Sequence, residues 1–433
     1  MSHLQLNIII VGAGIGGLAT AIFLARSGHN VQVLEAGNQL SEGGAGIQIS
    51  PNAMRILDSM GLKDVFYKEA TKNEGAVIRR YKDGKVLGKH RANTLELYGY
   101  HNLSMHRADY QKVLYDAALE ANAHISFGRK VISVDTSEPS LNLQDGSIIT
   151  ADLMIAADGK SFIRSALFPE IHPHATPDCA FRIILNREQM LSSPILSPLV
   201  LQPSSTIWFG PYRHIVAYTI RGTESLNIVF CGPDVAETGR WNEPADLDQL
   251  RKEYSDHEDT VKEILRVANE CHKFRISETP DLPSWTNSNG RLVLLGDAAH
   301  AMMPYMAQGA TQAIEDAAVL NGCLARAQSL NDISRLSKAY EDIRKPRAEK
   351  IKATSLGNMK QYGLPDGPEQ EERDEMYRKS HLPVSESTKE ILVSKPDNNA
   401  VYGSPAFSSW IYMYDTKEAL REYSGDEKEY SKR

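Results

Sequence analysis

The sequence predicts an α/β fold in which a parallel βαβ unit is interleaved with a mostly antiparallel β-sheet unit, with helices after them. Three observations predict it. An apolar strand, a glycine-rich turn and a helix follow one another in residues 6–27. Short strands recur from residue 171 to about residue 275. A buried strand that ends in glycine and aspartate returns near residue 296, so segments of the first kind flank the second kind.

Composition limits the class of protein. The 433 residues are 42% hydrophobic and 24% charged, as in ordinary globular proteins. The net charge of −7, without a long Lys/Arg block, argues against a nucleic-acid partner. No run of about 18 uninterrupted apolar residues occurs, so no stable membrane insertion is expected. The four cysteines, at positions 179, 231, 271 and 323, are too widely spaced for a metal site and predict reduced thiols in a cytoplasmic protein.

The N-terminal elements form a βαβ unit. LNIIIV, residues 6–11, is rich in β-branched residues and suits a central parallel strand. Residues 15–27 read as a helix, with Gly28 where a C-cap belongs. NVQVLE, residues 30–35, gives the second strand. The crossover between the two strands should be right-handed.

The next elements continue with one helix and several short strands. Residues 108–122 read as an amphipathic helix, and strands are expected at 124–127 and 131–135. A hairpin is expected to turn at Asp145-Gly146. It leads into a buried strand at 153–157.

The rest of the chain changes character twice. FRIIL, STIWFG, RHIVAYTI and LNIVFCG, all within 171–275, predict an antiparallel sheet with one covered face. Helices are expected at 312–328 and 332–353. Residues 363–376 read as a turn followed by a charged helix, and 381–405 are polar and contain proline.

A glycine motif follows the first strand. GAGIGG, residues 12–17, fits G-x-G-x-x-G, whose glycines allow a tight turn and close approach of a pyrophosphate to the helix N-terminus. Glu35 ends the next strand, where a carboxylate can accept both ribose hydroxyls. It disfavours a 2′-phosphate, so the motif predicts FAD or NAD rather than NADP. The residues expected to contact the dinucleotide are Gly12, Gly14, Ile15, Gly16, Gly17, Glu35 and Ala36.

Two further strands end in a carboxylate. ADLMIAADG ends with Asp158-Gly159, and RLVLLGD ends with Gly296-Asp297. Open α/β sheets bind ligands at the carboxyl ends of their strands. Either aspartate alone could instead be a helix N-cap.

Together with GAGIGG, these two stretches resemble the FAD-dependent aromatic hydroxylases, the single-component flavoprotein monooxygenases of the para-hydroxybenzoate and salicylate hydroxylase type. The resemblance covers about residues 6–350 and implies interleaved domains. The implied domains are a Rossmann-like FAD-binding domain of 1–75, 102–170 and 276–353, a substrate-binding β-sheet domain of 76–101 and 171–275, and a C-terminal extension of 354–433.

The resemblance also implies an activity. Non-covalently bound FAD would be reduced by NADH or NADPH, and O2 would form a flavin C4a-hydroperoxide that an electron-rich ring attacks. A small phenolic substrate is expected, and SSWIYMYD (408–415) and IRKPRAEKI (343–351) resemble fungal salicylate-hydroxylase-like members, which favours a salicylate- or 4-hydroxybenzoate-like acid. Hydroxylation with loss of the carboxylate and hydroxylation without it both stay open. The alternatives are epoxidation of an alkene or indole and FAD binding without turnover. Either a monomer or a homodimer is compatible with the sequence.

The resemblance assigns the remaining cofactor residues. Asp297 would bond a ribityl hydroxyl, Pro304 would lie against the isoalloxazine, and a helix N-terminus beginning within 306–312 would face the flavin N1–C2=O edge. Asp158 would serve FAD, or hold Arg107 or backbone instead. The full set outside the first motif is Gly46, Ile47, Arg107, Asp158, Gly296, Asp297, Pro304, Gln308, Gly309 and Ala310. Gln48 and Asn52 are polar candidates on the glycine-rich loop GGAGIQISPNAMRIL, residues 43–57.

The expected substrate wall is the strand GPYRHIVAYTI, residues 210–220. Tyr212, His214, Val216 and Tyr218 share one parity and so face the same way. A histidine or tyrosine that titrates near neutrality could deprotonate a phenol, and His214 and Tyr218 are both candidates. A relay through both residues, linked by water or substrate, is the alternative. Arg182 could bind a substrate carboxylate or form a structural ion pair. His300 is expected to pack near the flavin.

Overall fold

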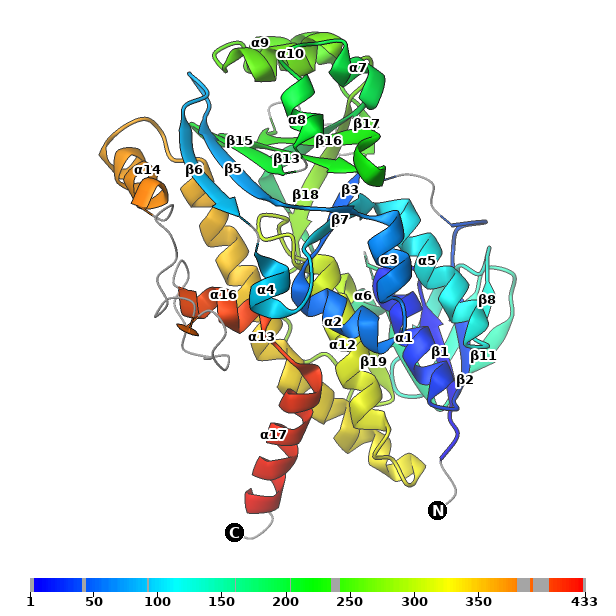
Figure 1. The fold of residues 1–433 in the computed structure, drawn as a ribbon. Coiled ribbons are helices and arrows are strands. Elements are labelled where there is room, and N and C mark those ends of the chain that lie inside the picture. The colour runs from blue at the N-terminus through cyan, green and yellow to red at the C-terminus, as the bar shows by residue number, and fades with distance from the viewer. Residues whose placement is uncertain are drawn as a thin grey trace.

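The computed structural model describes residues 4–40, 44–91, 93–159, 161–202, 204–234, 242–379, 390–391 and 405–430. Two large sheets organise the chain, and Figure 1 shows helices around both of them. Among the described residues, no helix combines the length and apolarity needed to span a bilayer.

The first large sheet is parallel and has five strands in the order β19-β12-β1-β2-β8. Its strands are β1 (Asn7–Val11), β2 (Asn30–Leu34), β8 (His124–Ser126), β12 (Leu153–Ala156) and β19 (Leu292–Leu294). The predicted central strand is therefore correct, because β1 pairs in parallel with β2 on one side and with β12 on the other. Apolar residues of β1 and β12 are buried on both faces, as parallel sheets require.

Long helices cover this sheet. They are α1 (Ile15–Arg26), α5 (Arg107–Glu120), α12 (Gly309–Leu324) and α13 (Ile333–Tyr362). Gly28 follows α1 with φ of +87°, as a residue just beyond a helix end requires. The helix predicted at 312–328 begins three residues earlier, at Gly309. The helix predicted at 332–353 continues through Pro346 to Tyr362, so that proline does not end it.

Two small antiparallel sheets stand beside the large one. The predicted hairpin forms β9 (Val131–Asp135), β10 (Ser140–Leu143) and β11 (Ile148–Thr150), and Gly146 has the positive φ that its turn needs. The second small sheet, β3-β7-β4, consists of β3 (Gly46–Ile49), β4 (Thr71–Lys72) and β7 (Leu103–His106). It carries the glycine-rich loop toward the second large sheet.

The second large sheet has eight strands in the order β17-β18-β13-β16-β15-β14-β5-β6. Neighbouring strands are antiparallel, except that β14 and β5 pair in parallel. The strands are β5 (Gly75–Arg80), β6 (Val86–Arg91), β13 (His174–Asn186), β14 (Ser205–Gly210), β15 (Arg213–Ile220), β16 (Ser225–Pro233), β17 (Asn242–Pro244) and β18 (His272–Glu278).

Four short helices that the sequence did not predict cover one face of this sheet. They are α7 (Arg187–Leu191), α8 (Ser197–Leu201), α9 (Leu247–Glu253) and α10 (Asp259–Val267). Trp208, Ile215 and Phe230 from the strands pack with Tyr254 and Ile264 from this helical layer in a separate core. Figure 1 shows α7–α10 on the side of the sheet away from α1, α5 and α12. The opposite face is therefore the one turned toward the five-stranded sheet.

The remaining elements are short or C-terminal. They are α2 (Pro51–Ser59), α3 (Lys63–Glu69), α4 (Thr94–Tyr98), α6 (Phe162–Leu167), α11 (Asp297–His300), α14 (Pro368–Lys379), α16 (Pro405–Tyr412), α17 (Thr416–Tyr430), and the 3-10 turns η1 (Arg221–Thr223) and η2 (Leu330–Asp332). The charged helix predicted within 363–376 corresponds to α14. The polar stretch 381–405 lies outside the described residues, apart from 390–391 and Pro405.

Candidate active site

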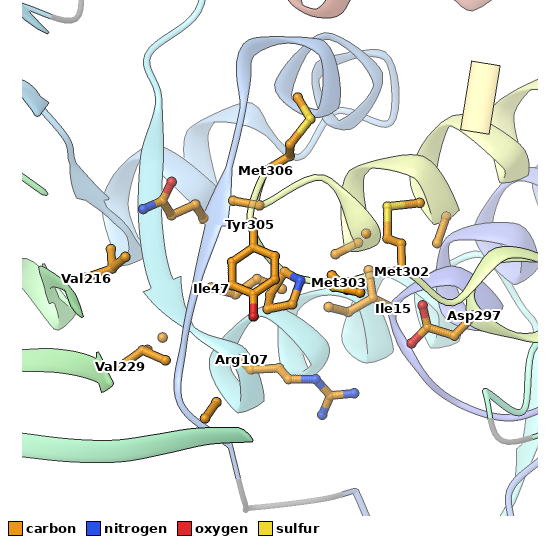
Figure 2. A pocket seen from close by; sticks show the side chains of 18 of the residues that line it. Ile15, Ile47, Arg107, Val216, Val229, Asp297, Met302, Met303, Tyr305 and Met306 are labelled. Carbon is orange, nitrogen blue, oxygen red and sulfur yellow. The ribbon is translucent and has the colours of Figure 1, made fainter. Parts of the chain in front are cut away.

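One cavity of about 1410 Å³ lies where the strand tips of the five-stranded sheet meet the uncovered face of the eight-stranded sheet. Ordinary ligand pockets measure roughly 300–1,000 Å³, so this cavity has room for a large ligand and a small one together. Figure 2 shows Val216 and Val229 of the eight-stranded sheet, Ile15 and Asp297 from segments that follow strands of the five-stranded sheet, and residues of the 302–306 loop around it.

The structure brings most of the predicted site residues to this cavity. Those that line it are Gly12, Gly14, Ile15, Gly16, Glu35, Gly46, Ile47, Gln48, Arg107, Asp158, Arg182, His214, Tyr218, Gly296, Asp297, Pro304, Gly309 and Ala310. Gly17, Ala36 and Gln308 do not line it.

The glycine motif forms a cradle that side chains would fill. A Cβ atom on Gly12 would lie 2.6 Å from the carbonyl oxygen of Ala157, and one on Gly17 would lie 2.0 Å from the carbonyl oxygen of Gly12. Gly17 therefore serves the packing of the turn rather than the cavity wall. Gly14 has no neighbouring heavy atom within 4 Å of its Cβ position, so this part of the turn is open to a ligand. The open space at Gly14 adjoins the N-terminus of α1, which is where a pyrophosphate would bind.

Glu35 directly follows β2 and is hydrogen-bonded to the glycine turn. Its Oε2 accepts a hydrogen bond of 2.8 Å from the Ala13 amide, and its Oε1 accepts one of 2.8 Å from the Gly37 amide. The carboxylate is half-buried and lines the cavity. The neighbouring Ala36 is exposed and points elsewhere. A ribose hydroxyl could donate to the remaining lone pairs of Glu35.

Arg164 joins the two aspartate-bearing strand tips. Its side chain is fully buried, and Nη1 donates to the carbonyl oxygens of Gly159 at 3.4 Å, Asp297 at 3.3 Å and Ala298 at 3.2 Å. The two tips are thereby held beside each other, although they are far apart in the sequence. The sequence signal for this contact is the arginine that follows the Asp158-Gly159 pair by five residues.

Asp158 binds backbone, which was one of its predicted alternatives. Its Oδ2 accepts a hydrogen bond of 3.1 Å from the Phe162 amide, at the start of α6. Its Oδ1 is buried without a hydrogen-bond partner among the described residues, and burial raises the pKa of this carboxyl group. A buried acceptor without a partner is a suitable site for a ligand hydroxyl.

The loop between α11 and α12 is pinned by α13. Ser355 donates to the Met303 carbonyl oxygen at 2.6 Å, and Asn358 Nδ2 donates to the Tyr305 carbonyl oxygen at 3.1 Å. Pro304 is thereby presented to the cavity. The helix α12 then begins at Gly309, and its first amides and positive dipole end face the same space.

Two polar residues predicted near the flavin have partners elsewhere. Gln308 Nε2 donates to Ser50 Oγ at 3.0 Å, and Asn52 donates to Gln308 Oε1 at 3.2 Å and to Glu315 Oε1 at 2.8 Å. Both side chains are buried behind the cavity wall. Gln308 can therefore offer a ligand its backbone groups, but not the carboxamide of its side chain. The expectation that the side chains of Asn52 and Gln308 face the cavity is therefore wrong, because they lie behind its wall and bond each other, Ser50 and Glu315.

A buried charge cluster, which the sequence analysis did not predict, lies behind α12. Arg344 binds Glu315 at 2.7 Å and Asp316 at 2.8 Å, and all three side chains are completely buried. His300 Nε2 lies 2.6 Å from Asp316 Oδ2, and its ring packs against Trp285. His300 was expected to pack near the flavin, but it does not line the cavity and is instead a hydrogen-bonding member of this cluster. The signal in the sequence was the Glu315-Asp316 pair inside an apolar helical run.

The predicted substrate wall on β15 is shorter than expected. His214, Val216 and Tyr218 line the cavity together, as their shared parity predicts. Tyr212 does not join them: it precedes the strand with φ of +58°, its amide bonds the Gly363 carbonyl oxygen, and its side chain is 67% exposed. The wall therefore begins at His214.

Neither candidate base on this wall titrates near neutrality. Burial lowers the pKa of His214 to about 3, and its ring packs against the rings of Tyr305 and Tyr362 at 5.1 and 5.3 Å. Burial also raises the pKa of Tyr218 above its ordinary value, with nearby Arg182 opposing the shift. The expectation that one of them is poised near pH 7 is therefore wrong.

Arg182 lines the cavity without a structural ion pair. Its guanidinium carbon lies 4.9 Å from the Phe274 ring centre, and its Nε is buried without a hydrogen-bond partner. No carboxylate of the described residues lies within ion-pair distance. Burial lowers the pKa of the guanidinium, which nevertheless remains charged. A half-buried cation without a carboxylate partner favours an anionic or carbonyl ligand.

The C-terminal elements close the cavity, which the sequence analysis did not predict. Met376 and Tyr377 of α14 and Phe407, Ile411 and Tyr412 of α16 line it. These helices carry no clear periodic signal in the sequence, so their place on the wall could be known only from the fold.

Comparison with known proteins decides the family. A family model described as "FAD binding domain" matches residues 5–355, which is most of the chain. The chain belongs to this FAD-binding family. The match ends where the C-terminal part that closes the cavity begins.

Relatives of known type agree with the family. The FAD-dependent monooxygenase OpS4 of Beauveria bassiana (strain ARSEF 2860) is 32% identical over 417 residues, covering 95% of each chain. The 3-amino-4-hydroxybenzoate 2-monooxygenase PtmB3 of Streptomyces platensis is 30% identical over 382 residues, covering 86% of this chain and 93% of the relative. The structure of a salicylate hydroxylase substrate complex superposes with a TM-score of 0.76 at 24% identity, covering 97% of this chain and 98% of that one.

This member of the family is an FAD-dependent monooxygenase of the aromatic hydroxylase type, an oxidoreductase that uses NAD(P)H and O2. The cradle at Gly14, the free acceptor on Asp158 and the N-terminus of α12 are the observations in this structure that fit bound FAD.

Proposed function

We propose that this monooxygenase hydroxylates a small phenolic acid held between the 302–306 loop and strand β15. The observation that carries the proposal is the unpaired guanidinium of Arg182 on the cavity wall, next to the aromatic surface of Tyr218 and Phe274. A carboxylate can accept two parallel hydrogen bonds from such a group. The relative PtmB3 is named for 3-amino-4-hydroxybenzoate, which is a phenolic acid, and this supports the same class here.

The residues of this chain hold FAD in the other part of the cavity. The Gly12–Gly17 turn would bind the pyrophosphate and Glu35 would bind a ribose. Asp158, Asp297 and Arg107 would bind the ribityl–phosphate region, and Pro304 would contact the ring system. The first amides of α12 face the ring edge that becomes negative on reduction. When bound, FAD supplies the transfer of electrons from NAD(P)H to O2.

The wall residues orient the aromatic ring and exclude water. Arg182 sets the position of the carboxylate, while Tyr218 and Val216 flank the ring, and the low polarity of the wall strengthens the charged contact. Gln48 and His214 complete the proposed substrate contacts. In this proposal, the FAD-binding domain comprises 1–75, 102–170 and 276–353, the substrate-binding domain comprises 76–101 and 171–275, and residues 354–433 form the extension.

A panel of benzoates and phenols tests this function. We expect hydroxybenzoates such as salicylate and 4-hydroxybenzoate to accelerate NAD(P)H oxidation, with a product that gains oxygen. Product mass decides whether the carboxylate is lost. The matched controls are benzoate, which lacks the hydroxyl group, and phenol, which lacks the carboxylate.

A variant makes the panel specific for the proposed contact. Arg182→Met keeps an unbranched side chain like the stem of arginine and removes the charged group, so it should raise KM for hydroxybenzoates at least tenfold and leave KM for phenol nearly unchanged. Turnover of alkenes or indoles, without any response to phenolic acids, would favour the epoxidase alternative. Size-exclusion chromatography and cell fractionation test whether a monomer or homodimer acts in the cytoplasm.

A further inference from the structure

A tyrosine–aspartate pair connects the cavity with the far side of its wall. Tyr305 directly follows Pro304, lines the cavity and is 7% exposed. Its hydroxyl donates a hydrogen bond of 3.0 Å to Asp178 Oδ2. Figure 2 shows the Tyr305 ring in the middle of the pocket, between the side of Val216 and Val229 and the side of Met303.

Asp178 lies on the outer side of this contact. It belongs to β13, is half-buried, and is not part of the cavity lining. The Tyr305 hydroxyl is therefore in contact with a carboxylate that is itself partly open to solvent. Because Asp178 is half-buried and does not line the cavity, we expect it to exchange its proton with solvent outside the cavity.

The tyrosine is held firmly at its other end. Asn358 Nδ2 donates to the Tyr305 carbonyl oxygen at 3.1 Å, and the ring packs edge-on against His214 with 5.1 Å between ring centres. These contacts leave the hydroxyl little freedom to leave Asp178. A tyrosine hydroxyl both donates and accepts, so it can accept from a substrate while it donates to Asp178.

The reaction requires a proton acceptor that the β15 wall does not supply. A phenol must lose its proton before its ring becomes electron-rich enough to attack electrophilic oxygen. His214 is neutral at pH 7 and too weak a base to remove that proton, because burial lowers its pKa to about 3. Burial raises the pKa of Tyr218, and no carboxylate of the described residues bonds its hydroxyl to take its proton. Burial raises the pKa of Tyr305 as well, so Tyr305 can accept a proton only by passing its own to its hydrogen-bonded partner, Asp178.

We propose that Tyr305 accepts the proton of the substrate's phenolic hydroxyl and passes its own proton to Asp178. This assignment rests on the proposed function and adds two residues to it. The substrate O–H bond breaks and an O–H bond forms at Tyr305 Oη. At the same time the original Tyr305 O–H bond breaks and a new O–H bond forms on the Asp178 carboxylate. Tyr305 ends unchanged, the substrate becomes a phenolate, and Asp178 then releases its proton to water.

The charge state of Asp178 gives the relay a pH dependence. Burial raises the pKa of the Asp178 carboxyl group, and the hydrogen bond from Tyr305 opposes that shift. A raised pKa makes Asp178 a better proton acceptor near neutral pH than an exposed aspartate. The relay needs the carboxylate form, so activity is present above this pKa and is lost as pH falls through it.

The other titratable groups around Asp178 do not take over this role. Burial raises the pKa of both the Cys179 thiol, on its own strand, and the Cys231 thiol, on β16, to about 12. Arg275 on β18 pairs in register with Cys179. Lys273 is paired with Asp234 beyond these residues. Below pH 9 both thiols stay protonated, so neither competes with Asp178 for the proton.

The test uses two variants and a matched control in the FAD-loaded enzyme. Tyr305→Phe and Asp178→Asn remove the two ends of the relay while keeping the side-chain shapes. The control is Tyr81→Phe, because Tyr81 is also 7% exposed and donates to Asp366 at 3.1 Å, but neither residue lines the cavity.

Five readouts separate the relay from a structural role. With the hydroxybenzoate that turns over in the panel, Tyr305→Phe should hydroxylate about 100-fold more slowly, the lower end of the effect of a general base. Flavin content and the rate of flavin reduction should stay at the wild-type level. In the oxidised enzyme, without turnover, the difference absorbance of bound substrate should show phenolate formation at a higher pH than in wild type. Asp178→Asn should also lose the acid limb of the wild-type pH profile.

The outcomes that overturn the relay are distinct from those that overturn the function. Wild-type rates and unshifted phenolate formation in both variants would refute the relay and leave the hydroxylase proposal intact. Loss of FAD or slow flavin reduction in parallel with the hydroxylation defect would make the pair structural and refute the relay equally. A wild-type enzyme that hydroxylates no phenol would refute the function and the relay together.

Discussion

Individual site residues were predictable where a backbone motif decides their place. Gly12, Gly14, Glu35 and Asp297 sit at strand tips, and the carboxyl ends of parallel strands meet at one edge whatever packs around them. Gln308 was not predictable in the same way. Its side-chain direction depends on Ser50, which lies 258 positions away in the sequence.

The chemistry of His214 was also beyond sequence reasoning. Its parity on the strand is legible, and it does face the cavity. Its pKa depends on the packing of Tyr305 and Tyr362 against the ring, and these residues come from two distant segments. Burial disfavours the charged imidazolium, so the pKa of His214 falls to about 3 and its titration lies outside the neutral range.

Asp297 provides a prediction for one cofactor contact. Asp297→Ala should weaken FAD binding, because a hydrogen bond to a charged group contributes about 1.5–3 kcal/mol, which is a loss of roughly 10- to 150-fold in affinity. The FAD dissociation constant, measured by flavin fluorescence, checks it. The control is Asp248→Ala, an exposed residue on α9 beyond the eight-stranded sheet. Equal FAD affinity in Asp297→Ala and wild type would remove Asp297 from the cofactor site.

At the scale of elements, long periodic segments were predicted well and short ones were not. The strands β1, β2 and β12 and the helices α1, α5, α12 and α13 follow from apolar runs and periodicity. The helices α7–α10 have between five and nine residues, and their apolar faces are legible only beside the sheet that they cover.

The helix α16 shows how a distant element becomes part of the site. Arg347 donates to the carbonyl oxygens of Trp410 at 3.0 Å and Ile411 at 3.1 Å, and its guanidinium lies 4.6 Å from the Trp410 ring centre. Arg55 of α2 donates to the carbonyl oxygens of Tyr412 and Tyr414, each at 3.0 Å. Two buried or half-buried arginines thus fix α16 against the cavity.

This attachment predicts an effect on substrate binding. Ile411→Ala removes part of the apolar wall, so KM for the aromatic substrate should rise by about 10-fold, the low end of what small apolar changes in a pocket produce. FAD content should stay at the wild-type level. Steady-state kinetics check it, with Ile148→Ala as the control because Ile148 is 68% exposed on β11. An unchanged KM in Ile411→Ala would show that α16 covers the cavity without contacting the substrate.

At the scale of the whole molecule, the interleaving of two sheet units was predicted from the return of the strand–Gly-Asp pattern near residue 296. One cavity is lined both by residues at the carboxyl ends of the five-stranded sheet and by residues on one face of the eight-stranded sheet. The contribution of the C-terminal helices was not predicted, because α14 has the charged sequence of an ordinary surface helix and the short apolar α16 was not predicted as a helix. The family match also stops at residue 355, before these helices begin.

The central claim is that FAD and a phenolic acid share this single cavity, with FAD at the strand tips and the substrate against β15. A crystal structure of the enzyme with FAD and the hydroxybenzoate that turns over tests it most directly. We predict the pyrophosphate on the Gly12–Gly17 turn, the ring system beside Pro304, and the substrate carboxylate on Arg182 with its hydroxyl at Tyr305 Oη. A dinucleotide bound away from the strand tips, or a substrate on the α7–α10 side of the eight-stranded sheet, would contradict it.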